Sequence, residues 1–238
     1  MKKIIVVILV WMACYHSLQA QVIIDSKAEI RNITSFKAIN IEDALEVYLT
    51  QSTEDGLAVS TTDERRQIIT EVKNEILYIS VRNNGGANNW SDKQRLKAYI
   101  SFKKINQIEV KGACNVNLTG NVQLDELSIK LSGATDFKSK GKIVVNKMAI
   151  DLSGASDLYM QGSSNFLLID VSGASKVKAD EFVTDVCDIK CSGASDIYIN
   201  ANKTILAQIS GASDLRYKGS AYIKEIKSTG ASSIKRMQ

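Results

Sequence analysis

The chain has 238 residues, with 30 lysines and arginines, 26 aspartates and glutamates, one histidine and no proline. Removal of residues 1–20 would take away Lys2 and Lys3, which leaves 28 cations against 26 anions and a net charge of +2. Such a balance does not predict nucleic acid or an anionic membrane as a partner. The same cut removes His16, so a mature chain could hold neither a histidine triad nor a histidine-ligated metal.

The first residues have the features of an export signal. Lys2 and Lys3 precede an apolar run at 4–13, and residues 17–20 (Ser-Leu-Gln-Ala) end in a small residue before Gln21. This pattern is typical of a bacterial secretory signal, so we expect a signal peptide over 1–20 and export across the inner membrane. The destination would be the periplasm, the outer surface or the medium. The apolar run is too short for a transmembrane segment, and no later stretch is long enough for one.

The alternative is a lipoprotein signal with a lipid anchor on Cys14. Trp11, three positions before that cysteine, fits such signals poorly, so we favour simple cleavage.

Residues 22–107 are predicted to form an N-terminal β-rich part with degenerate coils. Apolar and polar residues alternate in four short runs, at 36–41, 47–49, 57–59 and 77–81. Period-two alternation of β-branched and aromatic residues predicts strands. Asp43 occupies the position that a glycine holds in the later repeats. Residues 63–75 leave two alternatives open, a strand over 68–72 or a helix favoured by Asp-Glu-Arg-Arg.

A surface loop is predicted at residues 83–90, where Asn, Gly and Ala precede Trp90. Asn and Gly tolerate positive φ and interrupt strands. Trp90 is a candidate ligand contact on this loop, although we favour an anchor that folds back onto the domain.

Residues 108–238 carry one phrase seven times, most often as Ser-Gly-Ala-Ser-Asp. Its glycines are Gly112, Gly133, Gly154, Gly173, Gly193, Gly211 and Gly230, with successive gaps of 21, 21, 19, 20, 18 and 19 residues. A period near 20 residues indicates a stacked-repeat architecture.

The positions around each glycine alternate in character. Around Gly154, for example, Met148, Ile150, Leu152 and Leu158 lie at even offsets, and polar or aromatic residues occupy the odd ones. Since side chains alternate across a strand, the even offsets should share one inward face. The glycine and the Ser or Thr two positions later have the same parity, which predicts small inward residues at a tight bend.

The fold class that follows is all-β, a parallel β-solenoid of about 20-residue coils, which we expect to be right-handed. Equivalent residues of neighbouring coils would then form ladders about 4.8 Å apart. In the last coil Lys224 and Ser228 replace apolar residues, which predicts protection of an exposed edge.

The chain resembles the family called putative auto-transporter adhesin, head GIN domain, known from secreted proteins of Bacteroidetes. The front half matches at 36–39, 45–51 and 76–79, and the back half through the repeats at Gly133, Gly154, Gly193 and Gly211. The resemblance implies a parallel β-helix-like fold and a cell-surface or secreted setting. It implies no catalytic residues.

One candidate site is an acidic column three positions after the glycines, formed by Asp136, Asp157, Asp196 and Asp214. Stacked carboxylates supply the oxygen ligands that Ca²⁺ prefers. Lys176 interrupts the column, and Asp commonly caps backbone amides in turns, so we favour a turn-cap role over a metal site.

A second candidate is a ligand face five positions after the glycines. Tyr159 and Tyr198 alternate there with Lys178 and Arg216, and Lys138 and Lys235 extend the column. Aromatic and cationic side chains in a row suit sugars or acidic polymers, whereas the structural alternative is a solvated face that prevents aggregation.

Cys114, Cys187 and Cys191 fall at inward offsets, too far apart in this register for a disulfide, so we expect buried thiols.

We therefore expect an exported, adhesin-like binding or scaffold protein with a glycan or a surface protein as its partner and with no catalysis or cofactor. The alternatives are a polysaccharide-active β-helix enzyme, which needs two suitably spaced carboxyl groups, and a purely structural envelope protein.

Overall fold

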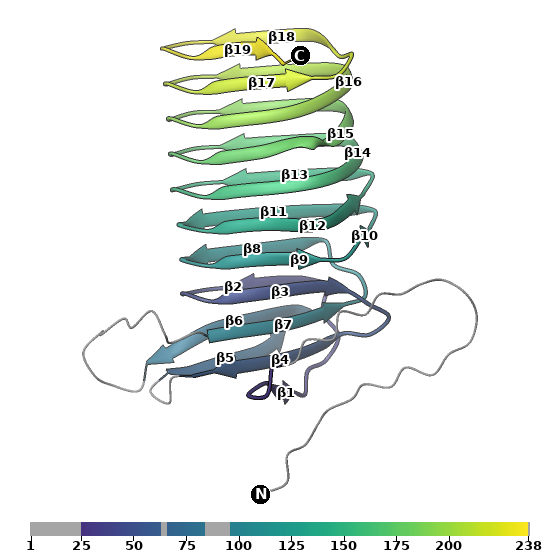
Figure 1. Cartoon of the computed structure of the whole chain (residues 1–238), viewed down its shortest axis with the longest axis vertical. Coiled ribbons are helices and arrows are strands. Elements are labelled where there is room, and N and C mark those ends of the chain that lie inside the picture. Colours follow the sequence, from purple (N-terminus) through teal and green to yellow (C-terminus); the bar gives the residue numbers. More distant parts are fainter. Residues whose placement is uncertain (1–24, 63–65, 84–95, 238) are drawn as a thin grey trace, which may run out of the picture.

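The computed structural model describes residues 25–62, 66–83 and 96–237, which form strands and turns stacked into a tall column (Figure 1). This confirms the predicted all-β solenoid. Across these residues there is no helical segment that could cross a membrane. The predicted leader, Cys14 and Trp90 lie outside the described residues.

The strands of the base and of the first coils come from the N-terminal half. They are β1 (Glu29–Arg31), β2 (Ala38–Ile41), β3 (Glu46–Gln51), β4 (Gly56–Thr61), β5 (Arg66–Lys73), β6 (Ile76–Asn83) and β7 (Leu96–Phe102). The regular coils follow as β8 (Gln107–Gly112), β9 (Asn115–Thr119), β10 (Val122–Gln123), β11 (Glu126–Gly133), β12 (Asp136–Val144), β13 (Lys147–Leu152), β14 (Asp157–Val171), β15 (Lys176–Cys191), β16 (Asp196–Ile209), β17 (Asp214–Lys218), β18 (Tyr222–Ser228) and β19 (Ser233–Arg236).

Each coil is flattened between two parallel ladders. We call sheet 1 the ladder of β7, β3, β9, β12, the first halves of β14, β15 and β16, then β17 and β19. Sheet 2 is the ladder of β6, β2, β8, β11, β13, the second halves of β14, β15 and β16, then β18. The repeated glycine turn joins sheet 2 to sheet 1, and β14 to β16 bend around the opposite edge.

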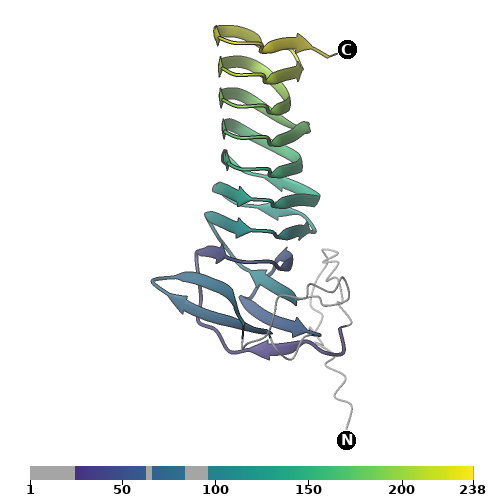
Figure 2. The same cartoon turned by 90° about the vertical axis from the view of Figure 1, so that its left-hand side faces the viewer.

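The stacking order at the base departs from the chain order. Strand β2 pairs with both β6 and β8, and β3 pairs with both β7 and β9. The coil of β2 and β3 is therefore held between two coils that come later in the sequence. Below it, β4 and β1 extend sheet 1 as antiparallel strands, and β5 extends sheet 2 in the same way, which widens the base (Figure 2).

The core fills the space between the two sheets. Met148, Ile150, Leu152 and Leu158 are all buried, as are their counterparts in neighbouring coils, so the predicted inward face is confirmed. Burial of aliphatic side chains in continuous ladders is the main stabilising contribution of such a column, at about 25 cal/mol per Å² of apolar surface.

The glycine turn is built differently from the prediction in one respect. Thr135 and its four serine equivalents are buried, as expected, but the repeat glycines lie at the exposed corner with positive φ. Positive φ interrupts the strand alternation, which is why parity fails at that position. From Gly133 to Gly230, the next residue is an alanine whose amide donates a hydrogen bond to the preceding repeat glycine's carbonyl (for example, Ala194 to Gly173, 2.8 Å).

The β5–β6 hairpin settles the alternative left open at residues 63–75. Residues 66–73 form a strand, so the helix is wrong. Asn74 and Glu75, both at positive φ, make a two-residue turn into β6. Two consecutive positive φ values are characteristic of a type I′ hairpin, but the usual Asn-Gly signal is absent here.

At the other end, β18 has a bulge at Lys224. Ile223 pairs with Ile205 and Glu225 pairs with Leu206, so Lys224 is the extra residue. Lys224 was expected at an inward apolar position, and the bulge corrects that register. A bulge and lysines on a terminal strand hinder further strand pairing, in line with the predicted edge protection.

Candidate functional site

The outer face of sheet 1 carries the predicted ligand residues in one line. Lys138 pairs in register with Tyr159, Tyr159 with Lys178, Lys178 with Tyr198, and Tyr198 with Arg216. We call these five side chains the tyrosine–cation row. The structure thus brings together five predicted residues with 18 to 21 positions between successive members, and Lys235 continues the line beside Arg216. Parallel in-register pairing and outward strand parity place them on one surface.

The outer cations of the row contact the tyrosines. The ammonium of Lys138 lies 5.6 Å from the centroid of the Tyr159 ring, and the guanidinium of Arg216 lies 5.2 Å from that of Tyr198. Arg216 also donates a hydrogen bond to the Tyr198 hydroxyl. Cation–π contacts at exposed sites contribute about 0.5–1 kcal/mol, so they orient the rings modestly.

Lys178, in the middle of the row, has an exposed side chain. It has no ion pair, hydrogen bond or ring contact with any residue that the structure describes. By contrast, Lys138 lies 3.9 Å from a carboxylate oxygen of Asp136, and Arg216 lies 3.1 Å from one of Asp214. One unpaired cation is therefore flanked by the two tyrosines.

The predicted acidic column runs beside this row as a ladder. Asp136 pairs with Asp157, Asp157 with Lys176, Lys176 with Asp196, and Asp196 with Asp214. Lys176 divides the four carboxylates into two pairs, as the sequence predicted. Within the ranges that the structure describes, no group of three or more His, Cys, Asp or Glu side chains is arranged to hold a metal ion.

The turn-cap role expected for these aspartates belongs to the buried hydroxyls instead. The Ser195 hydroxyl donates to the carbonyl of Gly173 at 3.3 Å and accepts from the amide of Ser175 at 3.4 Å. Asp214, in contrast, accepts from Arg216 and Ser233. Among the described residues, the four carboxylates receive no backbone amide. Their odd offset points them outward, away from the turn.

The row continues toward the base through residues that sequence reasoning missed. Lys138 pairs with Asn117, Asn117 with Tyr48, and Tyr48 with Tyr99. The rings of Tyr48 and Tyr99 stack with centroids 5.2 Å apart. Tyr48 lies five positions after Asp43, so the repeat offset itself could have identified it. Tyr99 does not lie at this offset from a repeat turn, so the same count does not identify it.

Tyr99 is tied to the start of the described chain. Its hydroxyl donates to Asp25 at 2.8 Å, and burial together with that carboxylate raises the pKa of Tyr99. Burial also acts to raise the pKa of Asp25, but the hydrogen bonds from Tyr99, Lys27 and Ser60 and the charge of Lys97 outweigh it. The net pKa of Asp25 therefore lies below its ordinary value.

The same face has a shallow hollow of about 470 Å³ near its base. Ala44, Leu45, Glu46, Leu96, Ala113, Asn115, Val116, Asn117, Asp136 and Lys138 line it. It is open and polar, unlike the enclosed apolar clefts that bind most small molecules. An extended ligand laid across the strands suits this face better than a small enclosed one.

The three described cysteines are free and buried, so the prediction of unpaired thiols is confirmed. Burial raises the pKa of Cys114, Cys187 and Cys191, which disfavours the reactive thiolate.

A sequence model of the family "Putative auto-transporter adhesin, head GIN domain" matches residues 35–221. The chain belongs to this family. The match spans the base apart from β1, the coil of β2 and β3, and nearly all the later coils, which confirms the predicted membership. Among curated proteins the comparison finds no match.

Solved structures share the fold of this GIN-domain chain. A putative adhesin from Bacteroides fragilis aligns with a TM-score of 0.77 at 23% identity, over 88% of this chain and 96% of that one. A putative adhesin from Parabacteroides distasonis gives 0.66 at 14% identity, over 88% and 96%. A putative lipid binding protein from the same organism gives 0.63 at 16% identity, over 89% and 96%.

Proposed function

We propose that this GIN-domain chain is an exported, adhesin-like binding protein that holds an extracellular glycan or surface protein on the outer face of sheet 1. The tyrosine–cation row carries the proposal. Two tyrosines and three cations lie in line on a strand ladder. An outer face whose role was solvation alone would not need aromatic side chains in this line.

The chemistry of the row suits a glycan. Aromatic rings pack against the apolar faces of sugar rings, and cations and carboxylates hydrogen-bond to their hydroxyls. Because the ladder is fixed before binding, little conformational entropy is lost when a ligand orders on it. The names of the family and of two neighbours, which are adhesins by description, support the same class.

The proposal includes no catalysis. Carboxylates 5–9.5 Å apart occur throughout a ladder of this kind, so their spacing does not identify a glycosidase pair.

The test is binding to an array of glycans and matrix proteins by the purified chain, with and without Tyr159→Ala and Tyr198→Ala. Tyr222→Ala is the control, because Tyr222 is 62% exposed on β18 of sheet 2. The double variant should weaken binding about fivefold or more, since each aromatic contact contributes about 0.5–1.5 kcal/mol. The proposal would be refuted if Tyr222→Ala weakened binding as much as the double variant, or if the native chain bound no glycan or matrix protein on the array. New reducing ends in the incubated glycans would refute the absence of catalysis.

Export is part of the same proposal. Mass spectrometry of the N-terminus from a bacterial host should find Gln21 at the start, and a lipidated Cys14 there would show a tethered protein instead.

A further inference from the structure

The tyrosine–cation row has a period of two coils. Its cations Lys138, Lys178 and Arg216 occupy alternate positions, with Tyr159 and Tyr198 between them. Strands in a sheet are about 4.8 Å apart, so successive cations lie about 10 Å apart along the column. Sugar residues in an extended chain advance by nearly one strand spacing each, so a disaccharide spans nearly one period of the row.

The charges around the row determine which charge density of a ligand this face can accept. Lys138 and Arg216 are already within 4.0 Å of carboxylates, and Lys178 alone of the three cations has no ion pair with a described carboxylate. Four aspartates flank the row, two positions away on the same strands. A ligand with an anion on every sugar would lie close to these carboxylates and be repelled at distances within the Debye length of about 8–10 Å. A neutral ligand would leave Lys178 unused.

We propose that the ligand of this face is a linear glycan with one carboxylate for every two sugars, laid along the axis of the column. Its acidic sugar binds at Lys178, and the neutral sugars on either side pack against Tyr159 and Tyr198. This inference rests on the proposed function and adds to it the class of glycan and its direction.

The position of the outer cations agrees with this arrangement. Lys138 contacts Tyr159 from the coil before it, and Arg216 contacts Tyr198 from the coil after it. Both contacts therefore come from the outer sides of the pair, and the coil between the tyrosines contributes only Lys178 to the row.

The test compares three hexasaccharides by isothermal titration calorimetry. Hyaluronan has one carboxylate for every two sugars, oligogalacturonate has one on each sugar, and chitin hexasaccharide has none. We expect hyaluronan to bind about tenfold more tightly than either, or better, because a charge-assisted hydrogen bond contributes about 1.5 kcal/mol or more.

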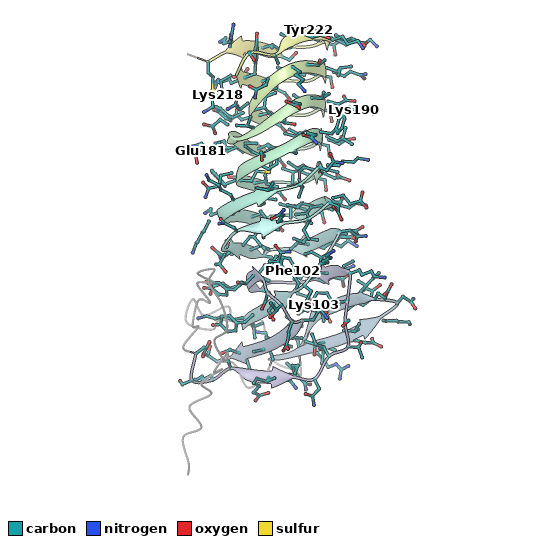
Figure 3. The ribbon with its side chains drawn as sticks, turned by 90° about the vertical axis from the view of Figure 1, so that its right-hand side faces the viewer. Phe102, Lys103, Glu181, Lys190, Lys218 and Tyr222 are labelled. Atoms are coloured by element: carbon teal, nitrogen blue, oxygen red, sulfur yellow. The ribbon has the colours of Figure 1, made fainter. Side chains whose placement is uncertain are left out.

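The decisive variant is Lys178→Gln, which should remove that preference and leave hyaluronan and chitin hexasaccharide equal. Lys178→Arg should keep it. Lys190→Gln is the matched control, because Lys178 lies in the sheet 1 half of β15 and Lys190 lies in its sheet 2 half. Figure 3 shows Lys190 on the other side of the column from Lys218, which belongs to sheet 1 like Lys178. Lys178 and Lys190 are both exposed, so neither Lys178→Gln nor Lys190→Gln should change the melting temperature.

Tighter binding of oligogalacturonate, equal binding of all three, or no effect of Lys178→Gln would overturn the inference. If Tyr159→Ala and Tyr198→Ala still abolished binding to a glycan or matrix protein in those cases, the proposed function would stand. If no ligand bound through this face, both would fail.

Discussion

A Cβ atom on Gly112 would lie 2.2 Å from the carbonyl oxygen of Asp43, the same oxygen that accepts a hydrogen bond from the amide of Ala113 at 3.0 Å. Gly112 is thus needed for two reasons: the carbonyl of the neighbouring coil leaves no room for a Cβ atom, and its φ is positive. Asp43 itself has positive φ and carries a side chain, which accepts a hydrogen bond from the amide of Val81. The prediction that Asp43 occupies a glycine position is confirmed.

The close approach predicts two different costs for glycine substitution. Gly193→Ala would place a Cβ 2.3 Å from the carbonyl oxygen of Gly173, whereas a Cβ on Gly120 would have no heavy atom within 4 Å, although its φ is also positive. We expect Gly120→Ala to lower the free energy of unfolding by about 1–2 kcal/mol from backbone strain alone. Gly193→Ala should lower it by about 3 kcal/mol or more. Urea denaturation measures both, and equal losses would show that the neighbouring coil is irrelevant.

The hydroxyl caps predict that Ser195 matters more to stability than Asp196. Ser195→Ala leaves the buried amide of Ser175 without its hydroxyl partner and should cost about 1–3 kcal/mol. Asp196→Ala changes an outward side chain and should stay within about 0.5 kcal/mol. A larger loss for the aspartate in the same denaturation experiment would restore it as the turn cap.

The acidic column predicts little response to calcium. Because Lys176 separates two carboxylate pairs, millimolar Ca²⁺ should leave the melting temperature unchanged. Differential scanning fluorimetry with Ca²⁺ or with chelator measures this. An increase that Asp136→Asn or Asp157→Asn abolished would establish a metal site at the first pair.

The link between Asp25 and Tyr99 predicts acid sensitivity at the base. The pKa of Asp25 is lower in the folded chain than its ordinary value of 3.8, so its contribution is present above that value and is lost as pH falls through the folded pKa. We expect the difference in melting temperature between the native chain and Asp25→Asn to be constant from pH 7 to 5 and to shrink below about pH 4. A difference that grew on acidification would contradict the sign.

The repeat coils could be predicted in detail because each copy gives the same information again. The even offsets identified the core, and the fifth position after each glycine identified the row. The same offset counted from Asp43 leads to Tyr48. Among the described repeat positions, parity failed at the glycines, where φ is positive, and at Lys224, where the strand bulges. The bulge has no period in the sequence, and the positive φ of the recurring glycines is not marked by the alternation of apolar and polar residues.

The base could not be predicted in the same way, because its pairings join unrelated segments. The pairing of β2 with β6 and β8 depends on long-range contacts that no local pattern encodes. The contact of Asp25 with Tyr99 depends on how side chains meet after the coils have stacked, as does the lack of an ion partner for Lys178 among the described residues. A sequence offset can place a residue on a face, but it does not show which neighbours will already be engaged.

The coil of β2 and β3 has a mechanical consequence. Since both its edges are hydrogen-bonded to strands made later, the chain cannot add coils in order of synthesis, and this coil waits until β6 to β9 have emerged. Once inserted, it resists extraction. After β1 has left β4, a pull on the N-terminal side would have to break both parallel ladders of β2 at once rather than peel a strand from an edge, so a load applied there would be shared between the base and the column.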